Sequence, residues 1–528
     1  MKWLKFNLNR FLRFIKAIVR NKKGAVGLCI LFVFVWFALF PWVFTPYDPI
    51  KDTGLAGSIA VPSWTRYLLG SEGYCENVKL ISDYGFNDSD SLNELVLDSS
   101  NMSRIYYGYS SIGYLSSGSI FIIYNRIEKL GRAENVTVKL FKRLIYPYKV
   151  PPERFIGNVA VFVEGMTSDV PVQVRFFIMK EGENNFFFIK NETKKVLYLW
   201  STSDKPLTSP PLGWISSTSG TISQMDSRSE VLKINMYGYF DEAKTKPYWH
   251  YYPVSPERDV FSGLPCNYTV GVEIVFFDKG KYENVHVTVY LDDLQFRTLG
   301  NSWGLLGTDH YGRDLFAQLV YGARISLYVG LLASFIGVVI GLIVGLAAGY
   351  LGKVVDEVLM RFTDMLLVIP LLPLLIVLVA VLGPSLNNLI LLLGFLGWMG
   401  FARVVRSQVL SLRERPFVEA AKAAGAGSGY IMFRHILPNI MALVYVTLAT
   451  SVPGAVVAEA SLSWLGFYDP KVMSWGRMLY EAQAQLASWY AWWWVIPPGL
   501  CIALIALSFI LIGFAMDEIL NPRLRERR

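Results

Sequence analysis

The residue types that most often do chemistry are few in this 528-residue chain, and their spacing forms no reaction centre. None of the four histidines has the spacing of a metal site such as H-E-x-x-H. Asp292 and Asp293 are adjacent in a strand-like run, where neighbouring side chains face opposite sides, so we do not expect them to act as a paired acid and base. We therefore predict no catalytic residue and no metal. The histidines are His250, His286, His310 and His435.

Nucleotide chemistry is not indicated either. The chain has no G-x-x-x-x-G-K-[ST] phosphate loop, and the pair Gly352-Lys353 lacks both the upstream glycine and the following hydroxyl. The chain itself is therefore not expected to bind ATP in that way, and we predict no cofactor and no enzymatic activity. A membrane-anchored hydrolase is disfavoured for the same reasons.

The composition indicates a membrane protein. Hydrophobic residues make up 53% of the chain and charged residues only 17%, whereas soluble domains are about 25% charged. The apolar residues lie in long uncharged runs near the two ends, on either side of a polar middle. This distribution predicts a helical membrane protein that carries one large inserted soluble domain.

Six membrane-spanning helices are predicted from the uncharged runs. A helix of about 20 residues crosses a hydrocarbon core about 30 Å thick. The run 365–402 is too long for one span, and the turn residues Gly383-Pro384-Ser385 divide it into two. We therefore expect a first transmembrane helix at 24–45 and five more within 301–520. The uncharged runs are 25–44, 325–352, 365–402, 437–458 and 491–516.

Lysine and arginine predict the orientation, because they are enriched in cytoplasmic segments. Residues 1–23 hold eight of them and no acid, and the loop at about 411–438 and the tail at 521–528 are also basic. All three segments fall on one side when six spans are counted, so both termini are expected in the cytoplasm. Residues 1–23 also read as an amphipathic helix on the inner membrane surface, in contact with lipid, with a disordered basic tail as the alternative.

The same count places the segment 70–300 outside the cell. It contains runs such as 285–296 in which Val, Ile, Phe and Tyr alternate with polar residues, and these short runs predict a β-sandwich. It also contains five N-x-S/T glycan acceptor sites, which belong on an outer surface and raise the possibility of an archaeal source. The acceptors are Asn87, Asn101, Asn135, Asn191 and Asn267.

Two cysteines lie near the two ends of this segment. Cys75 and Cys266 are the only cysteines in it, and an outer compartment permits disulfides. We predict a disulfide between them that closes the base of the insert; two buried thiols are the alternative.

One motif stands out in the basic loop. Residues Glu419-Ala420-Ala421-Lys-Ala-Ala-Gly425 are strong helix formers that end at Gly425 and Gly427, which predicts a short helix. The motif resembles the EAA motif of ABC importer permeases, where E-A-A-x-x-x-G lies a fixed distance before a Leu-Pro pair, here Leu437-Pro438.

Other segments strengthen the resemblance. G-T-D-H-Y-G-R-D at 307–314, S-W-G-R-M-L at 474–479 and N-P-R-L-R at 521–525 are similar to segments of the dipeptide/oligopeptide/nickel class, in its C-type subunit. The likeness covers about residues 1–65 and 300–528. Related permeases usually have a short outer segment where this chain has the insert.

The resemblance implies a type I ABC importer permease that works by alternating access. Its implied partners are a second permease subunit, two ATP-binding subunits that hydrolyse ATP, and an extracellular solute-binding protein; no nucleic acid is implied. The coupling residues carried over are Glu419, Ala420, Ala421, Gly425 and Gly427.

Peptides are the solutes implied by the class. The alternative is oligosaccharide import by the same class of transporter, with the insert docking a glycan or the binding protein. An exporter is disfavoured because exporters generally lack the EAA motif. A surface adhesin or sensor is also disfavoured, because the coupling loop would have no function in such a protein.

Overall fold

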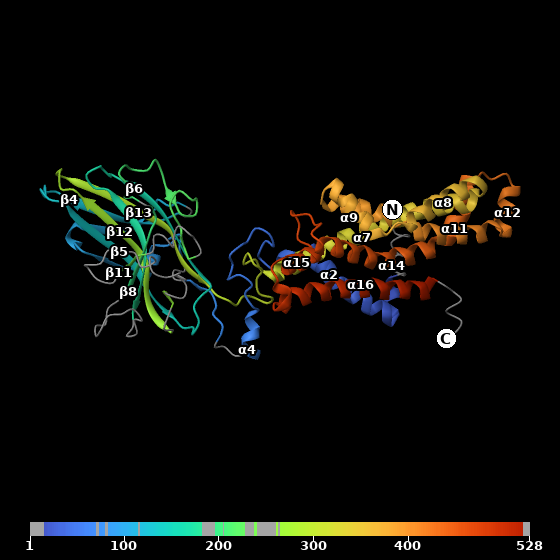
Figure 1. Ribbon diagram of the computed structural model, residues 1–528, viewed down its shortest axis with the longest axis horizontal. Coiled ribbons are helices and arrows are strands. Elements are labelled where there is room, and N and C mark those ends of the chain that lie inside the picture. Colours follow the sequence, from blue (N-terminus) through green and yellow to red (C-terminus); the bar gives the residue numbers. More distant parts are fainter. Residues whose placement is uncertain are drawn as a thin grey trace. The chain divides into compact units, whose positions relative to one another are not determined.

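The computed structural model describes residues 15–69, 73–79, 83–114, 117–181, 196–203, 205–227, 237–239, 260–261 and 265–520. The chain forms two compact units (Figure 1), one made of Met1–Thr53 with Arg313–Arg528 and one made of Gly54–Gly312. Residues 15–20 of the predicted N-terminal helix are helical. Residues 1–14 of that helix, the tail 521–528 and Asn191 lie outside the described residues.

The first unit is helical. Its elements are α2 (Lys22–Leu39), α3 (Pro41–Phe44), α7 (Leu315–Leu351), α8 (Lys353–Val368), α9 (Leu371–Leu382), α10 (Leu386–Leu396), α11 (Met399–Arg413), α12 (Pro416–Ala423), α13 (Ser428–Ile431), a π-helical turn (Met432–Ile436), α14 (Leu437–Trp464), α15 (Trp475–Ala484), a 3₁₀ turn (Ala487–Trp489) and α16 (Trp492–Leu520).

Five helical stretches of the described chain are long and apolar enough to cross a membrane. A sixth span is obtained if α8 and α9, which are bent by 88° at a short break, count as one. The predicted number was six. The five stretches are Lys22–Leu39, Leu315–Leu351, Leu386–Arg413, Ser428–Trp464 and Trp492–Leu520.

Local sequence explains where these helices begin and end. The side chain of Asp314 accepts a hydrogen bond from the Ala317 backbone N–H and caps the start of α7. Gly383, at φ +87°, ends α9, and Ser385 caps α10. The predicted break at 383–385 is therefore present. The α8–α9 bend lies at Ile369-Pro370, where proline forces the preceding residue into an extended conformation.

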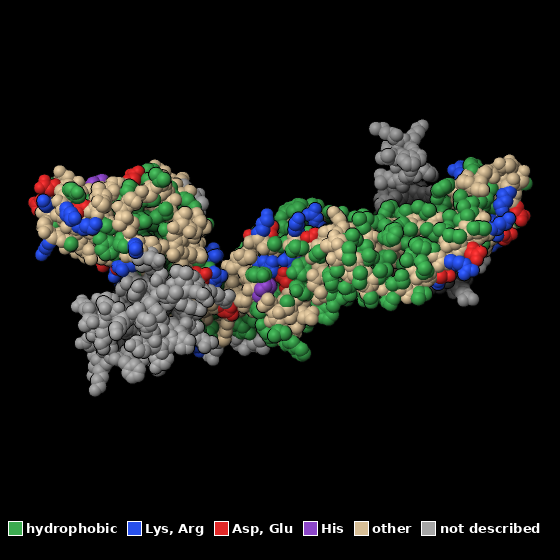
Figure 2. Space-filling model, turned by 45° about the horizontal axis from the view of Figure 1, so that its top comes forward, with side chains coloured by type: hydrophobic (Ala, Val, Ile, Leu, Met, Phe, Trp, Pro, Cys, Tyr) green, Lys and Arg blue, Asp and Glu red, His purple; other side chains and the backbone are tan. Residues whose placement is uncertain are grey.

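Glycines bring α7 and α11 close together. A Cβ at Gly345 would lie 2.6 Å from the carbonyl oxygen of Ala402, and one at Gly349 would lie 2.9 Å from that of Arg406. Small residues four positions apart allow membrane helices to pack backbone against backbone. Figure 2 shows hydrophobic side chains over the long helices and charged side chains at both ends of this band, one of which holds α12. We call this end of the bundle the coupling end.

The second unit contains two antiparallel sheets that enclose one core. In the described residues, one sheet has 7 strands with the central order β10-β6-β13-β4-β3, and the other has 6 in the order β11-β8-β7-β12-β5-β2. The strands are β1 (Val78–Lys79), β2 (Val96–Ser99), β3 (Ile105–Ser110), β4 (Ser119–Arg126), β5 (Glu134–Tyr146), β6 (Arg154–Glu164), β7 (Val172–Glu181), β8 (Val196–Ser201), β9 (Ile215–Ser216), β10 (Met225–Asp226), β11 (Tyr237–Tyr239), β12 (Cys266–Asp278) and β13 (Val285–Leu299).

The predicted alternation along β13 is present at its start. Val285, Val287, Val289 and Leu291 are all buried in the core between the sheets. Further on, the pairing of β13 with β6 shifts between Asp292 and Gln295, and Asp293 has a positive φ of 49°. We expected Asp292 and Asp293 to face opposite sides because side chains alternate along a regular strand. The bulge interrupts that alternation at these two residues.

The chain enters and leaves the second unit through paired backbone. The N–H of Gly57 donates to the Gly300 carbonyl at 2.8 Å, and the N–H of Val61 donates to that of Asn301 at 2.8 Å. Gly54 is hydrogen-bonded to Tyr311 in the same way at 2.9 Å. These contacts explain why the unit extends from Gly54 to Gly312, beyond the predicted 70–300.

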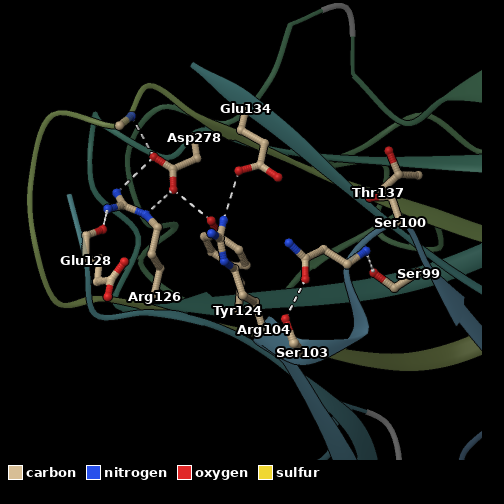
Figure 3. A network of polar contacts seen from close by, with 12 residues as sticks. Ser99, Ser100, Ser103, Arg104, Tyr124, Arg126, Glu128, Glu134, Thr137 and Asp278 are labelled. Atoms are coloured by element: carbon tan, nitrogen blue, oxygen red, sulfur yellow. Dashed lines mark hydrogen bonds and ion pairs between the residues drawn. The ribbon is translucent and has the colours of Figure 1, made fainter. Parts of the chain in front are cut away.

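A polar network lies at one edge of the sandwich core (Figure 3). The Arg126 guanidinium donates to both oxygens of Asp278, at 2.6 Å and 3.1 Å, and the Tyr124 hydroxyl donates to the same carboxylate at 2.7 Å. Burial favours a raised pKa for Asp278, but the hydrogen bonds from Arg126, Tyr124 and the Gly280 backbone hold this pKa below its usual value. The buried charges are therefore paired and hydrogen-bonded.

Candidate coupling site

The EAA motif forms a short helix with a defined start and stop. Pro416 occupies the first turn of α12, and Glu419 lies in the same turn. A carboxylate at this position interacts favourably with the positive end of the helix dipole. At the other end Gly425 has a φ of +82°. Its N–H donates to the Lys422 carbonyl, and the Ala426 N–H donates to that of Ala421. These two bonds form a Schellman motif, which needs a left-handed residue such as glycine at position 425.

One face of this segment is buried and the other is exposed. Val418 is fully buried in a cluster that also contains Ile431 and Ile436, and Ala421 packs against its edge. The remaining predicted coupling residues, Glu419, Ala420, Gly425 and Gly427, are exposed. Glu419 has no hydrogen-bond or ion-pair partner among the described residues. The motif therefore presents an unpaired carboxylate beside small residues on an accessible surface.

The buried face belongs to a cluster that joins three long helices. Its members come from α7, α11, α12, α13, the π-helical turn and α14, so the short helix is attached to three candidate spans. The members are Val338, Leu346, Tyr350, Phe401, Val405, Val409, Val418, Ile431, Ile436, Ile440 and Val444.

Polar contacts reinforce these attachments. The Lys422 ammonium lies 5.7 Å from the centroid of the Tyr350 ring at the end of α7. The Arg406 guanidinium on α11 forms an ion pair with both carboxylate oxygens of Asp356 on α8. Its Nη2 atom lies 2.6 Å from Asp356 Oδ2. Arg403 pairs with Asp364 in the same way. These contacts connect α12 to α7 and α11 to α8.

Sequence reasoning missed three exposed aromatic rings around α12. Phe417, Tyr430 and Phe433 have exposed fractions of 41%, 59% and 68%. His435 lies between two of them, with ring centroids 6.4 Å from Phe417 and 5.6 Å from Tyr430. Their signal in the sequence is aromatic residues in a loop otherwise composed of small and charged residues. Exposed rings of this kind mark protein contact surfaces.

The other predicted site residues lie in the second unit. Asn87, Asn135 and Asn267 are exposed and Asn101 is half-buried. The predicted disulfide is not formed in the structure, which holds Cys75 and Cys266 as thiols.

Each of the two thiols has its own neighbours. The Cys75 sulfur lies 3.5 Å from the Pro151 carbonyl, and the Cys266 sulfur lies 3.5 Å from that of Asn267. The buried Tyr146, which is the strand partner of Cys266, contacts Cys75. Burial also raises the pKa of the Cys75 thiol.

Comparison with known proteins places the helical unit. Residues 337–526 match the family described as binding-protein-dependent transport system inner membrane component. The dipeptide transport system permease DppC of Alkalihalophilus pseudofirmus is 40% identical over 220 residues, which are 42% of this chain and 72% of the relative. The oligopeptide permease OppC of Bacillus subtilis is 37% identical over 222 residues, again 42% and 72%.

A solved structure of the methionine ABC transporter MetNI in an inward-facing conformation is 22% identical, over 39% of this chain and 95% of that chain, with a TM-score of 0.30. The extent and identity of the sequence matches settle the family. The chain belongs to the binding-protein-dependent transport system inner membrane components, as a permease subunit of the C-type in the dipeptide/oligopeptide class.

Proposed function

We propose that this chain forms half of the translocation pathway of an ATP-driven importer of short peptides, working by alternating access. The observation that carries this proposal is the EAA helix, α12, whose exposed face carries Glu419 and whose other face is built into the cluster shared by α7, α11 and α14. Such a helix receives a movement at its surface and passes it to the spans.

The proposed partners follow from this surface. The exposed face of α12, with Phe417, Tyr430 and Phe433 around it, docks into a cleft on one ATP-binding subunit. A second permease with its own coupling helix engages the other ATP-binding subunit and completes the pathway. An extracellular solute-binding protein delivers the solute.

The proposed orientation puts the coupling end in the cytoplasm of a cell membrane. The Lys23 ammonium lies 2.7 Å from the Glu518 carboxylate, so the first and last spans have their terminal ends together. Both termini then lie in the cytoplasm, and the unit Gly54–Gly312 lies outside, where it assists capture of the solute. The exposed Asn87, Asn135 and Asn267 are proposed to carry glycans, which mass spectrometry of the purified protein detects directly.

The coupling role is tested by reversing the charge of Glu419. In the reconstituted transporter, Glu419→Lys should abolish peptide uptake and the stimulation of ATP hydrolysis by loaded binding protein, while the subunit remains in the membrane. The matched control is Glu357→Lys, another exposed carboxylate, which lies on α8 and not on α12. Normal uptake by Glu419→Lys, or equal loss in both variants, rejects the proposed role of α12.

A further inference from the structure

Four aromatic side chains form a row across one sheet of the sandwich. Phe162 on β6 is the ladder partner of Tyr290 on β13, and Tyr290 is in turn the partner of Phe121 on β4. Trp214 extends the row beyond β6, since it directly precedes β9, which pairs with β6. The row therefore runs perpendicular to the strands, over β6, β13 and β4 (Figure 1). We call these four residues the aromatic row.

The aromatic row lies on the outer face of the sheet. Successive side chains of a strand point to opposite faces, and the residues before and after each row member in β4, β6 and β13 belong to the buried core. The four row members are half-buried. The ring of Phe162 has its centroid 5.8 Å from that of Trp214 and 5.8 Å from that of Tyr290, at interplanar angles of 33° and 27°.

The polar groups around the row are acidic. The exposed Glu164 has its Oε2 atom 3.3 Å from the Tyr290 hydroxyl. The ring of Tyr114 lies 6.0 Å from that of Trp214, and the Tyr114 backbone N–H donates to Asp292 at 2.6 Å. In the described part of the sheet, the two ladder rows that flank the rings contain Glu164 and Asp292 and no lysine or arginine.

This combination selects a class of ligand. Cross-strand aromatic pairs stabilise a sheet, but neighbouring rings on an outer face also offer a platform on which flat apolar groups can stack. The sugar units of a linear glycan have such flat C–H faces, and their hydroxyl groups can donate to carboxylates such as Glu164. The ring spacing of 5.8 Å is close to the length of one hexose unit. An acidic glycan would instead be repelled by the two carboxylates.

We propose that the aromatic row binds a linear neutral polysaccharide that lies across the strands. Its sugar faces stack on Trp214, Phe162 and Tyr290, and its hydroxyl groups donate to Glu164. Such a site holds the second unit on a glycan, whichever solute the spans of the first unit carry.

The test is isothermal titration calorimetry on the full-length protein in lipid nanodiscs, which avoids sugar-based detergents. The probes are cellohexaose, maltohexaose and mannohexaose, together with their disaccharides and with hexagalacturonate as an acidic comparison. At least one neutral hexasaccharide should bind with a Kd below about 1 mM. Its disaccharide should bind about tenfold more weakly or less, because it covers fewer rings.

Ring and charge variants identify the surface. Trp214→Ala and Tyr290→Ala should each weaken binding of that hexasaccharide about tenfold or more. Glu164→Lys, an exposed change that leaves every ring in place, should weaken the neutral hexasaccharide and strengthen hexagalacturonate. The matched control is Tyr282→Ala, which removes a 62% exposed ring between β12 and β13 and should leave all affinities unchanged.

Three results overturn the inference. The first is that no neutral hexasaccharide binds, and the second is that hexagalacturonate binds wild type as tightly as the best neutral probe. The third is wild-type affinity in Trp214→Ala or in Glu164→Lys. Melting temperatures of all variants are measured alongside, so that an alanine variant that fails to fold leaves the decision to Glu164→Lys.

Discussion

The ammonium group of Lys422 lies 5.7 Å from the centre of the Tyr350 ring, so a residue of α12 is held over the last turn of α7. A cation–π contact at a partly exposed site contributes about 0.5–1 kcal/mol. We predict that Tyr350→Leu lowers peptide uptake about two- to fivefold by loosening this connection, while basal ATP hydrolysis persists. The measurement is uptake per ATP hydrolysed. Lys353→Ala, which removes another exposed cation of the same end, should leave that ratio unchanged.

Gly425 and Gly427 allow a controlled comparison of two glycines at the end of α12. A Cβ at either position meets no atom within 4 Å, so neither substitution by alanine causes a clash. Gly425, however, has a φ of +82°, whereas Gly427 has a φ of −68°. We predict that Gly425→Ala costs about 1–2 kcal/mol of local stability and impairs coupling, while Gly427→Ala is neutral.

Hydrogen exchange of the backbone in α12 measures the local stability, and reconstituted uptake measures the coupling. Equal behaviour of the two alanine variants would contradict a conformational role for Gly425. The bulkier Gly425→Trp should also abolish uptake while the protein remains in the membrane, because the exposed surface of α12 then no longer fits a partner.

The sandwich should lose stability in acid through Asp278. Its pKa is lowered in the folded state, whereas an unfolded aspartate titrates near about 3.9. The carboxylate therefore contributes stability above about pH 4, and this contribution is lost as the pH falls from there through the folded pKa. Acid unfolding monitored by near-ultraviolet circular dichroism should show this dependence.

Asp278→Asn isolates that contribution. The substitution leaves the buried Arg126 guanidinium without its main partner, and removing one member of a buried pair costs about 3–5 kcal/mol. We expect a large loss of stability at pH 7 and a flatter acid profile. An unchanged acid profile would assign the pH dependence to other groups.

A second buried ionic cluster joins α15 to the residue before the cap of α7. The Glu481 carboxylate accepts from Arg313 at 2.6 Å and from Arg477 at 2.9 Å, and all three side chains are at most 9% exposed. Glu481→Ala removes the carboxylate that two buried guanidinium groups share, so we predict a loss of about 3–5 kcal/mol and a lower melting temperature in detergent. Gln483→Ala, an exposed change on the same helix, should have little effect. Similar melting temperatures for the two variants refute the prediction.

The helical unit was predictable to the extent that charge marks membrane boundaries. The break at Gly383-Pro384-Ser385 was found because turn residues interrupt an uncharged run. The start of α7 was placed ten residues late, at 325, because the uncharged run begins only after Arg324. The helix itself begins at Leu315, directly after its cap at Asp314. Pro370 marks the 88° bend in the sequence, but within the run 365–402 only the turn residues at 383–385 were interpreted as a break.

The sandwich was predictable where short runs rich in Val, Ile, Phe and Tyr are bounded by turn residues. The strands β5, β7, β8, β12 and β13 were expected near their observed positions from the runs 135–140, 172–179, 196–200, 268–277 and 285–296. β6 was missed, and its residues Phe155 to Val161 are buried on both faces. The run 186–189 lies outside the described residues, as does most of 231–239, of which only 237–239 is described, in β11.

The candidate site also has parts that the sequence predicts and parts that it does not. Glu419 and Gly425 were found because their spacing forms a motif, but the buried cluster around Val418 draws on elements far apart in the sequence, from α7 to α14. No local pattern reveals such a convergence. The thiol state of Cys75 and Cys266 likewise depends on tertiary surroundings and not on their positions near the ends of the insert.

The paired backbone at Gly57–Gly300 and Val61–Asn301 has an evolutionary consequence. A module whose entry and exit strands are hydrogen-bonded to each other can be gained, lost or exchanged in one recombination event, because the host gene needs only two adjacent joining points. The same property makes the segment a cassette for protein engineering. Reporter domains with neighbouring termini can be spliced in at this position, and the segment can be grafted onto carriers that have only a short connection there.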